Sequence, residues 1–534
     1  MRSFIIIVVF ITMWSQPSAS QSTSLTAETR ELLIQKAALL RKQERYYDAV
    51  KQLDSILAQN SRDAQVLLFR GDLLLQNGMY AKAVDAYRKL LPLNYEATIT
   101  TINLSYALFM NHKPKKALIF AKKAWLHNKT HSNAIINYFN ALLWNRKTIQ
   151  AALFLKKQDS LLTKEQKNIL NARLFTSSGD YKKGVQLYDS LIKIYPNKYY
   201  IQEYAEVLLG KKQLTQSVNI MDSSQQFFTV KELSSYMAKA KETQQQRVGT
   251  EVSYFKDVAQ NKRIDFSVWW QQPEVKKYSI RTSTGISTIT APTNEKTTAY
   301  YAQTLITERW SMAWTGETHL RLNVIKPINS NSFSSLTGQQ SIKFQPNDRR
   351  MIGLLYNTDI LNYTANLLGK NIRSNNVGYI THLMMTGNDG FYSQGSAGWL
   401  SDKNQRYQFF GSLYHLFRTE PTLKAGVSVA ALHFKDSTIK YYFSPNRYIN
   451  SEAFFDFSTP LPSLSKFYLQ GQLAGGLQQI ERQNWEPAFR LQTELGLRLK
   501  HFETSLKYQT SNVASNTGSG YKFNWFTLRV NWKW

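Results

Sequence analysis

The sequence predicts an α+β multidomain chain, in which an all-α array of helical repeats precedes an all-β antiparallel barrel. Two observations predict this division. Before residue 246, small residues recur every 34 positions and apolar residues follow the 3.6-residue period of helices. After residue 246, apolar and polar residues alternate with the period of two that strands require. The expected parts are a signal peptide (1–20), the helical repeats (21–245) and the barrel (246–534).

The first twenty residues have the pattern of a cleavable signal peptide. Arg2 precedes the apolar run FIIIVVFITMW, and Ser18-Ala19-Ser20 supplies small residues before the expected mature start near Gln21. This run is too short to span a bilayer comfortably. No later stretch offers the roughly 18 consecutive apolar residues of a transmembrane helix, so insertion in a membrane would require strands.

Composition narrows the chemistry and the partners. The chain has no cysteine, which excludes disulfides, thiolate metal sites and a lipid-modified cysteine at the mature start. Its net charge of +29 is spread over both halves. A secreted precursor seldom meets nucleic acid, so we expect no nucleic-acid partner and favour phosphate-bearing lipid heads or anionic polymers. A generally basic surface without a dedicated partner is the alternative.

The helical region is built from repeated segments. QERYYDAVKQLDSIL recurs as QNGMYAKAVDAYRKLL and then as NHKPKKALIFAKKAW, and about six units follow one another. Small residues would let the two helices of each unit approach closely; they are Ala49, Ala83, Ala117 and Ala151 in the second helices, and Gly71, Ser105, Ala172 and Ala205 in the first. Gly184 takes the place of the alanine in a later unit.

This period of 34 residues resembles that of tetratricopeptide repeats. The resemblance implies a curved solenoid whose concave face binds peptides or extended polymers, with a spacer or assembly scaffold as the alternative. Exposed lysines could attract an anionic chain or could form an ordinary solvated face; they are Lys113, Lys115, Lys116, Lys122 and Lys123.

The last strand shows the alternation of the barrel most clearly. In the last fourteen residues, Tyr521 to Trp534, one face carries Phe526, Leu528, Val530, Trp532 and Trp534, and the other carries Trp525, Thr527, Arg529, Asn531 and Lys533. About sixteen strand candidates of this kind can be marked, with twelve or fourteen strands left open. Nine of the 12 tryptophans lie in this region, as the aromatic girdles of a transmembrane barrel require.

The connections between the strands differ in length. PNDRR, GNDG, TEPT, PLPSLS and KHF are short, whereas residues 324–340, 357–376, 436–448 and 510–520 form long connections. Outer-membrane barrels have short periplasmic turns and longer external loops. We therefore predict an outer-membrane location with the helical repeats in the periplasm. A soluble sandwich, whose charged face looks at solvent, is the alternative.

The alternation also predicts which charged side chains line the barrel lumen. They are Arg281, Glu317, His319, Arg321, Glu452, Asp456, Arg490, Glu494, Arg498, Lys500, Glu503, Lys507 and Arg529. These charges either pair across the interior or set a field that favours anionic or neutral sugar chains.

Catalysis has little support in the sequence. Only His319, beside Glu317 and Arg321, could belong to a general acid and base constellation. No lipase-like spacing of serine, histidine and acid accompanies it, and neither a metal-ligand cluster nor a phosphate-binding glycine loop stands out. We expect no enzyme activity, no metal and no cofactor.

A tetratricopeptide array followed by such a barrel resembles the outer-membrane exporters of cellulose and poly-N-acetylglucosamine. In YYFSPNRYINSEAFF, Tyr442-Phe443-Ser444-Pro445 and Tyr448 are similar to a segment of the cellulose exporter. The start of the barrel, with Tyr254, Phe255 and Trp269 or Trp270, resembles the YaiO family of outer-membrane proteins. This chain has far fewer repeats than the large exporters.

The resemblance implies a β-barrel that exports an exopolysaccharide or helps to assemble it. The implied partners are outer-membrane lipid, the barrel-insertion machinery, and a polysaccharide or periplasmic proteins bound by the repeats. A non-conducting scaffold or receptor and, with less support, a lipid-modifying barrel enzyme are the alternatives. The sequence does not specify the polymer, an inner-membrane partner, or whether the lumen is open or plugged.

Overall fold

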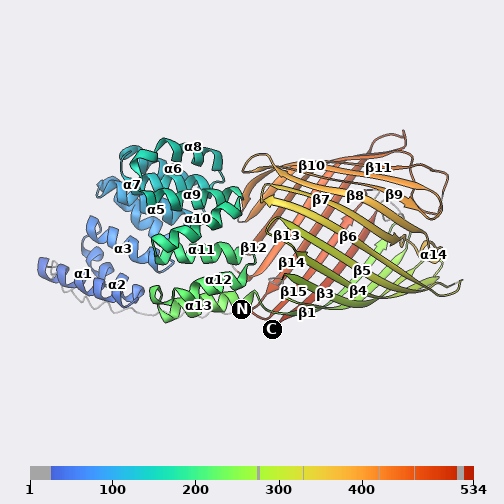
Figure 1. Cartoon of the computed structure of the whole chain (residues 1–534), viewed down its shortest axis with the longest axis horizontal. Helices are drawn as coiled ribbons and strands as arrows, with labels where there is room; N and C mark the ends of the chain where they lie inside the picture. Colours follow the sequence, from blue (N-terminus) through green and yellow to red (C-terminus); the bar gives the residue numbers. More distant parts are fainter. Residues whose placement is uncertain are drawn as a thin grey trace, which may run out of the picture. The chain divides into compact units, whose positions relative to one another are not determined.

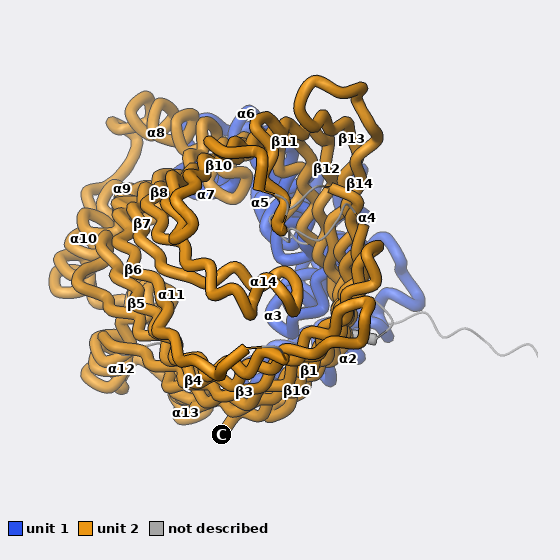
Figure 2. The backbone as a smooth tube through the Cα atoms, turned by 90° about the vertical axis from the view of Figure 1, so that its right-hand side faces the viewer, with its two compact units in different colours: residues 1–141 blue, residues 142–534 orange. Residues whose placement is uncertain are grey.

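The computed structural model describes residues 26–273, 277–328, 330–419, 421–439, 441–461, 464–513 and 522–534 (Figure 1). The predicted signal peptide and mature start lie outside these residues. The chain divides into two compact units, residues 1–141 and residues 142–534 (Figure 2).

The described part of the chain up to residue 246 is helical, as the repeat pattern predicts. Unit 1 holds α1 (Ala27–Lys42), α2 (Tyr46–Gln59), α3 (Ala64–Gln76), α4 (Tyr80–Leu90), α5 (Ala97–Met110) and α6 (Pro114–His127). Helix α7 (Ser132–Trp144) spans the division. Unit 2 begins with α8 (Thr148–Lys157), α9 (Lys164–Ser178), α10 (Tyr181–Ile194), α11 (Lys198–Gly210), α12 (Leu214–Ser223) and α13 (Val230–Glu242). No helix among the residues described is long and apolar enough to cross a membrane.

The small residues of the repeat pattern are buried where helices touch. Ala49, Ala83 and Ala117 have no exposed surface. A β-carbon on Gly71 of α3 would lie 2.6 Å from the ring of Tyr87 in α4, so this contact requires glycine. The small residues that recur every 34 positions therefore lie where neighbouring helices approach each other most closely.

Buried polar side chains fix the packing of α3, α4 and α5. The Tyr87 hydroxyl donates to Asp72 Oδ1 at 2.6 Å, and Asn103 Nδ2 donates to the same oxygen at 3.0 Å. The corresponding place in unit 2 has Tyr188 donating to Glu203 Oε1 at 2.6 Å, while Arg173 forms an ion pair with Glu203 at 2.7 Å. Both clusters satisfy a carboxylate that burial would otherwise disfavour.

The second part of unit 2 is a closed antiparallel barrel, and each strand pairs with its neighbours in sequence. Strand β1 also pairs with β16, which closes the barrel. The strands are β1 (Arg247–Asp257), β2 (Lys262–Gln271), β3 (Tyr278–Thr290), β4 (Lys296–Arg309), β5 (Trp314–Lys326), β6 (Phe333–Asn347), β7 (Arg350–Ile360), β8 (Arg373–Met384), β9 (Asp389–Leu400), β10 (Gln405–Thr419), β11 (Thr422–Phe434), β12 (Tyr448–Leu461), β13 (Leu464–Ile480), β14 (Glu486–Arg498), β15 (Phe502–Ser511) and β16 (Phe523–Lys533). The prediction of about sixteen strands is confirmed.

The barrel is apolar outside and polar inside. In β6, Leu336 is 64% exposed, while its neighbours Ser335 and Thr337 are 3% and 5% exposed. In β11 the same inversion places Val427 and Val429 on the exposed face around buried Ser428. A barrel in water would need the opposite arrangement, because apolar side chains favour burial.

Connections of different length lie at the two ends of the barrel. One end has the turns 348–349, 385–388 and 499–501, and the other end has the longer connections between β7 and β8 and between β11 and β12. The connections expected at 324–340 and 357–376 are shorter than predicted. Strand β5 continues to Lys326 and β7 to Ile360, and β6 and β8 begin at Phe333 and Arg373.

The connection between β7 and β8 folds into the ring of strands, where Figure 2 shows its short helix α14 (Ala365–Gly369). Thr297 Oγ1 of β4 donates to the carbonyl of Ala365 at 2.9 Å. Leu368 packs with an apolar cluster from β3, β4 and β5, while Leu367 belongs to a second cluster that includes Leu400 and Leu432 of other strands. The segment thus contacts separate parts of the barrel wall.

The Tyr87–Asp72 contact predicts a stability effect that depends on pH. Burial raises the pKa of Asp72, so ionisation of this group opposes folding, and its contribution to stability is lost as the pH rises through the folded-state pKa. Replacing Tyr87 by Phe removes a donor to the carboxylate. We expect a loss of about 1–3 kcal/mol at neutral pH, and a smaller loss at about pH 3.5, where Asp72 is protonated.

Hydrogen–deuterium exchange of α3 and α4 in the whole chain measures this effect. Tyr199→Phe is the control, because Tyr199 is 72% exposed. Equal loss of protection in Tyr87→Phe at both pH values would contradict the role given to Asp72.

Candidate functional site in the barrel lumen

Among the predicted lumen residues, Glu452 of β12 forms an ion pair with Arg490 of β14. Arg490 Nη2 and Nε lie 2.7 and 2.9 Å from Glu452 Oε2. Glu452 is 3% exposed. The intervening strand β13 places Gly476 opposite Glu452 and Ala474 opposite Arg490. These small residues leave room for two long side chains to meet across a strand.

Arg529 forms its ion pair where the barrel closes. Its Nε lies 2.6 Å from Glu251 Oε2, and the two residues face each other in the β1–β16 register. Sequence reasoning named Arg529 and missed Glu251, although the alternation in RVGTEVSYF places Glu251 on the same face as Ser253. The partner lies 278 residues away in sequence, and only closure of the barrel brings the two together.

Two further predicted acids are paired with lysines that the sequence did not single out. Lys343 Nζ lies 2.6 Å from Glu317 Oε2, and Lys424 Nζ lies 2.6 Å from Asp456 Oδ2. Both lysines sit on strands adjacent to their acids. Opposite charges on neighbouring strands offset the cost of removing each ion from water.

The remaining predicted residues of the last strands lie near the short-turn end. Arg498 Nη2 lies 3.0 Å from Glu503 Oε1, and Lys533 Nζ lies 3.5 Å from Glu503 Oε2. Lys500 is exposed in the turn between β14 and β15 and lies outside both strands. Glu494 accepts hydrogen bonds from Tyr468 and Gln470, and it faces Lys507 in the register of β14 and β15.

The predicted arginines of β3 and β5 lie over aromatic rings. The Arg281 guanidinium is 4.2 Å from the ring centroid of Trp269, and that of Arg321 is 3.9 Å from the ring centroid of Tyr301. Neither arginine forms an ion pair with an acid within the described part of the chain. Stacking on a ring compensates part of the charge and leaves donor groups for other partners.

The residues around His319 are not arranged as an acid and base pair. His319 Nε2 lies 3.3 Å from Gln303 Oε1, whereas Glu317 is held by Lys343. Arg321 donates from Nε to Asn323 Oδ1 at 2.8 Å. Each member of the predicted constellation therefore has a different partner.

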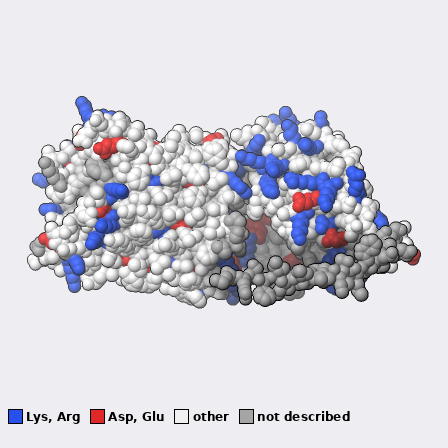
Figure 3. Space-filling model, turned by 180° about the vertical axis from the view of Figure 1, so that it is seen from behind, with Lys and Arg blue, Asp and Glu red and all other residues white. Residues whose placement is uncertain are grey.

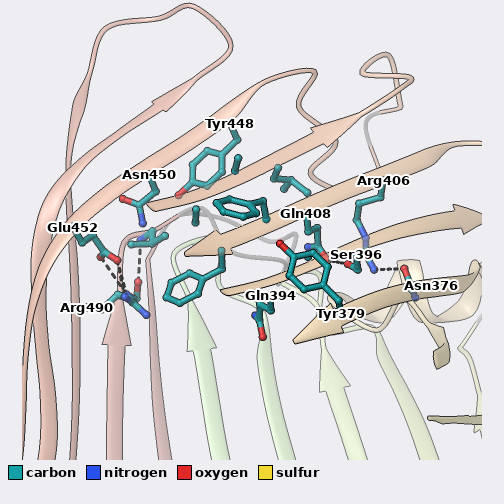
Figure 4. Close-up of a pocket in the computed structure, with 18 of the residues that line it drawn as sticks. Asn376, Tyr379, Gln394, Ser396, Arg406, Gln408, Tyr448, Asn450, Glu452 and Arg490 are labelled. Atoms are coloured by element: carbon teal, nitrogen blue, oxygen red, sulfur yellow. Dashed lines mark hydrogen bonds and ion pairs between the residues drawn. The ribbon is translucent and has the colours of Figure 1, made fainter. Parts of the chain in front are cut away.

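A cavity of about 570 Å³ lies between β7–β12 and β14–β16 (Figure 4). Its wall combines amides, aromatic rings and the Glu452–Arg490 pair; the polar and aromatic lining includes Asn357, Asn376, Gln394, Arg406, Gln408, Phe410, Tyr448, Asn450 and Phe523. Of these residues, the alternation pattern predicted only Glu452 and Arg490 as lumen residues, because the prediction was limited to charged side chains; Tyr448 was named only for its resemblance to the cellulose exporter.

Two smaller cavities lie along the same wall. One of about 180 Å³ is lined by His319, Arg321, Asn323 and Asp359. Another of about 260 Å³ is lined by residues that include Lys424, Asp456 and Arg490. The lumen therefore offers a series of polar spaces, and amide, hydroxyl and aromatic groups of this kind suit hydrogen bonding to a hydroxylated ligand.

Comparison with known proteins supports the repeat assignment. The tetratricopeptide repeat family matches residues 34–96. No curated protein matches the chain.

Several solved structures are similar to parts of the chain at low sequence identity. A structure described as a bacterial polysaccharide outer membrane secretin is 12% identical, covers 55% of this chain and 99% of its own, and gives a TM-score of 0.45. A tetratricopeptide repeat protein from Parabacteroides merdae is 14% identical over 40% of this chain and 85% of its own, with a TM-score of 0.36. A tetratricopeptide repeat protein of Thermus thermophilus is 18% identical over 34% of this chain and 99% of its own, with a TM-score of 0.30.

The buried ion pair predicts a large effect of one arginine and a small effect of another. Replacing Arg490 by Gln leaves Glu452 buried without a cation, which we expect to cost about 3–5 kcal/mol. Arg498→Gln is the matched control; its side chain is 61% exposed, and Lys533 also contacts Glu503. We expect it to cost less than about 1 kcal/mol.

The temperature at which the folded barrel loses its fast migration on unboiled gels measures both effects. The double variant Arg490→Gln with Glu452→Gln should recover most of the loss, because it removes the unpaired charge. Equal midpoints for the two single variants would contradict the role of the Glu452–Arg490 pair.

Proposed function

We propose that the protein is an outer-membrane barrel that exports a polysaccharide or helps to assemble it, with the helical repeats as a periplasmic adaptor. The observation that carries this proposal is the inverted barrel, whose outer face is apolar and whose lumen is polar. The closed ring of paired strands and the tetratricopeptide helices support it.

Closure supports the membrane location. In a bilayer every backbone N–H and C=O group needs a partner within the protein, and a closed barrel supplies one for each strand. The exposed apolar side chains of β6 and β11 then contact lipid instead of water. On the face shown in Figure 3, a broad band of the barrel surface carries hardly any charged side chains, while Lys and Arg gather over the helices.

Contacts within unit 2 support the periplasmic position of the repeats. Asp348, in the turn between β6 and β7, accepts a hydrogen bond from the hydroxyl of Tyr181 in α10 and lies 3.0 Å from Lys211 Nζ. Gln246 and Trp534 exchange backbone hydrogen bonds of 3.0 and 3.2 Å at the same end of the barrel. Short turns face the periplasm in outer-membrane barrels, so this end and the adjoining helices would be periplasmic.

The lumen supports a sugar polymer as the cargo. Many of its charges are paired, while amides and hydroxyls along its cavities can hydrogen-bond to saccharide hydroxyl groups. Aromatic rings beside them can contact the apolar faces of sugar rings. The repeat array could hold the polymer or a periplasmic protein, because solenoids of this type bind extended ligands.

A non-conducting scaffold is the second candidate. The observation that favours it is the β7–β8 connection, which carries α14 into the ring of strands and joins two apolar clusters there. A fixed plug would suit a scaffold, whereas a removable one would suit an exporter.

The proposed location predicts a heat-modifiable membrane protein. We expect the protein in the outer-membrane fraction, migrating faster on gels without boiling than after boiling, because a closed barrel resists unfolding by detergent. Fractionation and paired gels measure this. Recovery in the soluble periplasmic fraction with identical mobilities would contradict the proposal.

Removing the β7–β8 connection separates an exporter from a scaffold. Ile360 and Arg373 face each other in the register of β7 and β8, so an Asn-Gly turn can replace residues 361–372 without breaking strand pairing. We expect single-channel conductance in planar bilayers to rise severalfold. A matched control replaces residues 482–485, which are exposed and lie in another connection, by Asn-Gly. Absence of conductance in both the native and the shortened barrel would contradict export and favour the scaffold.

A further inference from the structure

We propose that the 570 Å³ cavity is a binding site for one acidic sugar unit, whose carboxylate is held by Arg406 and Asn376. This inference rests on the proposed export function and adds the class of saccharide to it. Three features of the cavity wall support it: an arginine without an ion-pair partner, buried polar atoms without hydrogen-bond partners, both among the described residues, and aromatic rings in the same lining.

One charge of the cavity lining has no ion-pair partner among the described residues, although Asp359 of β7 interacts with it electrostatically from outside the lining. Its charged lining residues are Arg406, Glu452 and Arg490, and the last two form the buried ion pair described above. Arg406 donates from Nη2 to Asn376 Oδ1 at 3.0 Å and from Nη1 to the Tyr363 hydroxyl at 3.5 Å, both neutral groups. Among the described residues Arg406 forms no ion pair. A guanidinium in such a place favours a carboxylate, which can accept more than one of its hydrogen bonds.

Three buried polar atoms of the cavity wall have no hydrogen-bond partner among the described residues. They are Nε of Arg406, Nδ2 of Asn376 and Oδ1 of Asn450. Asn376 and Asn450 are 2% and 3% exposed, so solvent does not readily satisfy them. Leaving a buried polar group unpaired is unfavourable, and native proteins keep few such groups.

The chemistry of these atoms defines the ligand. The two donors belong to side chains that are hydrogen-bonded to each other through Arg406 Nη2 and Asn376 Oδ1, so both are part of one local cluster of donors, and a carboxylate has two oxygens to accept from them. Asn450 Oδ1 is an acceptor and suits a sugar hydroxyl group. Small rotations of these side chains would turn the three atoms towards a ligand in the cavity.

Aromatic side chains complete the site. Phe410, Tyr448 and Phe523 line the same cavity and offer apolar faces to the C–H groups of a sugar ring. Tyr448 is held in place by its hydroxyl, which donates to Gln478 Oε1 at 3.2 Å. A volume of 570 Å³ is within the range of sites for small ligands, which is enough for a sugar unit with part of its neighbours.

The cavity adjoins the β7–β8 connection. Leu432, Tyr448 and Val513 line the cavity and also belong to the apolar cluster that holds Leu361 and Leu367. Arg406 faces Phe434 of that cluster in the β10–β11 register, so a sugar chain leaving through this end of the lumen would meet Arg406 and the cluster at the same level.

Binding of short oligosaccharides to the whole chain in detergent tests the site. The probes are an oligogalacturonate of about four units and cellotetraose, a neutral oligomer of the same length, titrated by calorimetry. We expect the native protein to bind the acidic probe at least about tenfold more tightly, because a hydrogen bond between a guanidinium and a carboxylate is stronger than one between neutral groups. Arg406→Gln should lose this preference, and Arg406→Lys should keep part of it.

Two more variants distinguish a specific loss of binding from a general effect of misfolding. Arg482→Gln removes an exposed arginine from the β13–β14 connection and should bind as the native protein does. Asn450→Asp preserves the side-chain shape and adds a negative charge to the cavity, so it should weaken the acidic probe and leave the neutral one unchanged. Heat-modifiable migration checks that each variant is folded.

Equal affinity of the native protein for both probes, or an unchanged preference in folded Arg406→Gln, would overturn the acidic-sugar site. These outcomes differ from failure of the export function. A barrel that conducts without preferring the acidic probe overturns this inference alone. A barrel that binds the acidic probe but never conducts supports the site and overturns export.

Discussion

Pairing of β1 with β16 is the constraint on which the rest of the barrel depends. Once these strands pair, no strand edge is left open, and each side chain faces either the outside or the lumen. The outer face can then be apolar, because the backbone N–H and C=O groups of the strands need no hydrogen-bond partners from the surroundings. Glu251 and Arg529 meet at this seam and form a 2.6 Å ion pair. An ion pair at the point of closure favours the correct register over a shift by one residue, which would turn one of the two charges outwards and separate it from its partner.

The same alternation sends many charged side chains into one enclosed space, and the structure neutralises most of them in pairs. Small residues make some pairs possible: Gly476 and Ala474 on β13 let Glu452 reach Arg490 on the strand beyond. Arg406 has no ion-pair partner among the described residues, and its guanidinium donates to the amide of Asn376 and the hydroxyl of Tyr363. Arg281 and Arg321 also lack an acid partner there, but each lies over an aromatic ring, whereas Arg406 lines a cavity beside buried polar atoms that no described residue satisfies.

The periodic patterns of the sequence predicted the fold. The ion-pair partners and the amide residues of the site follow no such pattern, so the sequence did not predict them. The 34-residue repeat predicted the helices, and the alternation of apolar and polar residues with a period of two predicted the number of strands. The partners Glu251, Lys343 and Lys424 did not, because each pair depends on the register between strands. The amide-rich wall around Asn376 and Asn450 was missed for another reason: amides carry no charge, and their burial is visible only in the folded barrel. Helix α14, with the short sequence ANLLG, is too brief for any period to reveal.

The two ends of the barrel are held by different kinds of contact, and this difference bears on how a polymer could leave. At the short-turn end, Tyr181 and Lys211 hold Asp348, and burial together with the hydrogen bond to Asp348 raises the pKa of Tyr181, so the phenol remains a donor at neutral pH. At the other end, the β7–β8 connection is kept in place by apolar contacts, a hydrogen bond from Thr297 and a long one between Arg406 and Tyr363. Apolar contacts have no fixed direction, so such a segment can shift and repack, whereas the charged contacts of the short-turn end have defined partners. Movement that opens the lumen would therefore begin at the long-loop end, while the strands keep the register set by closure.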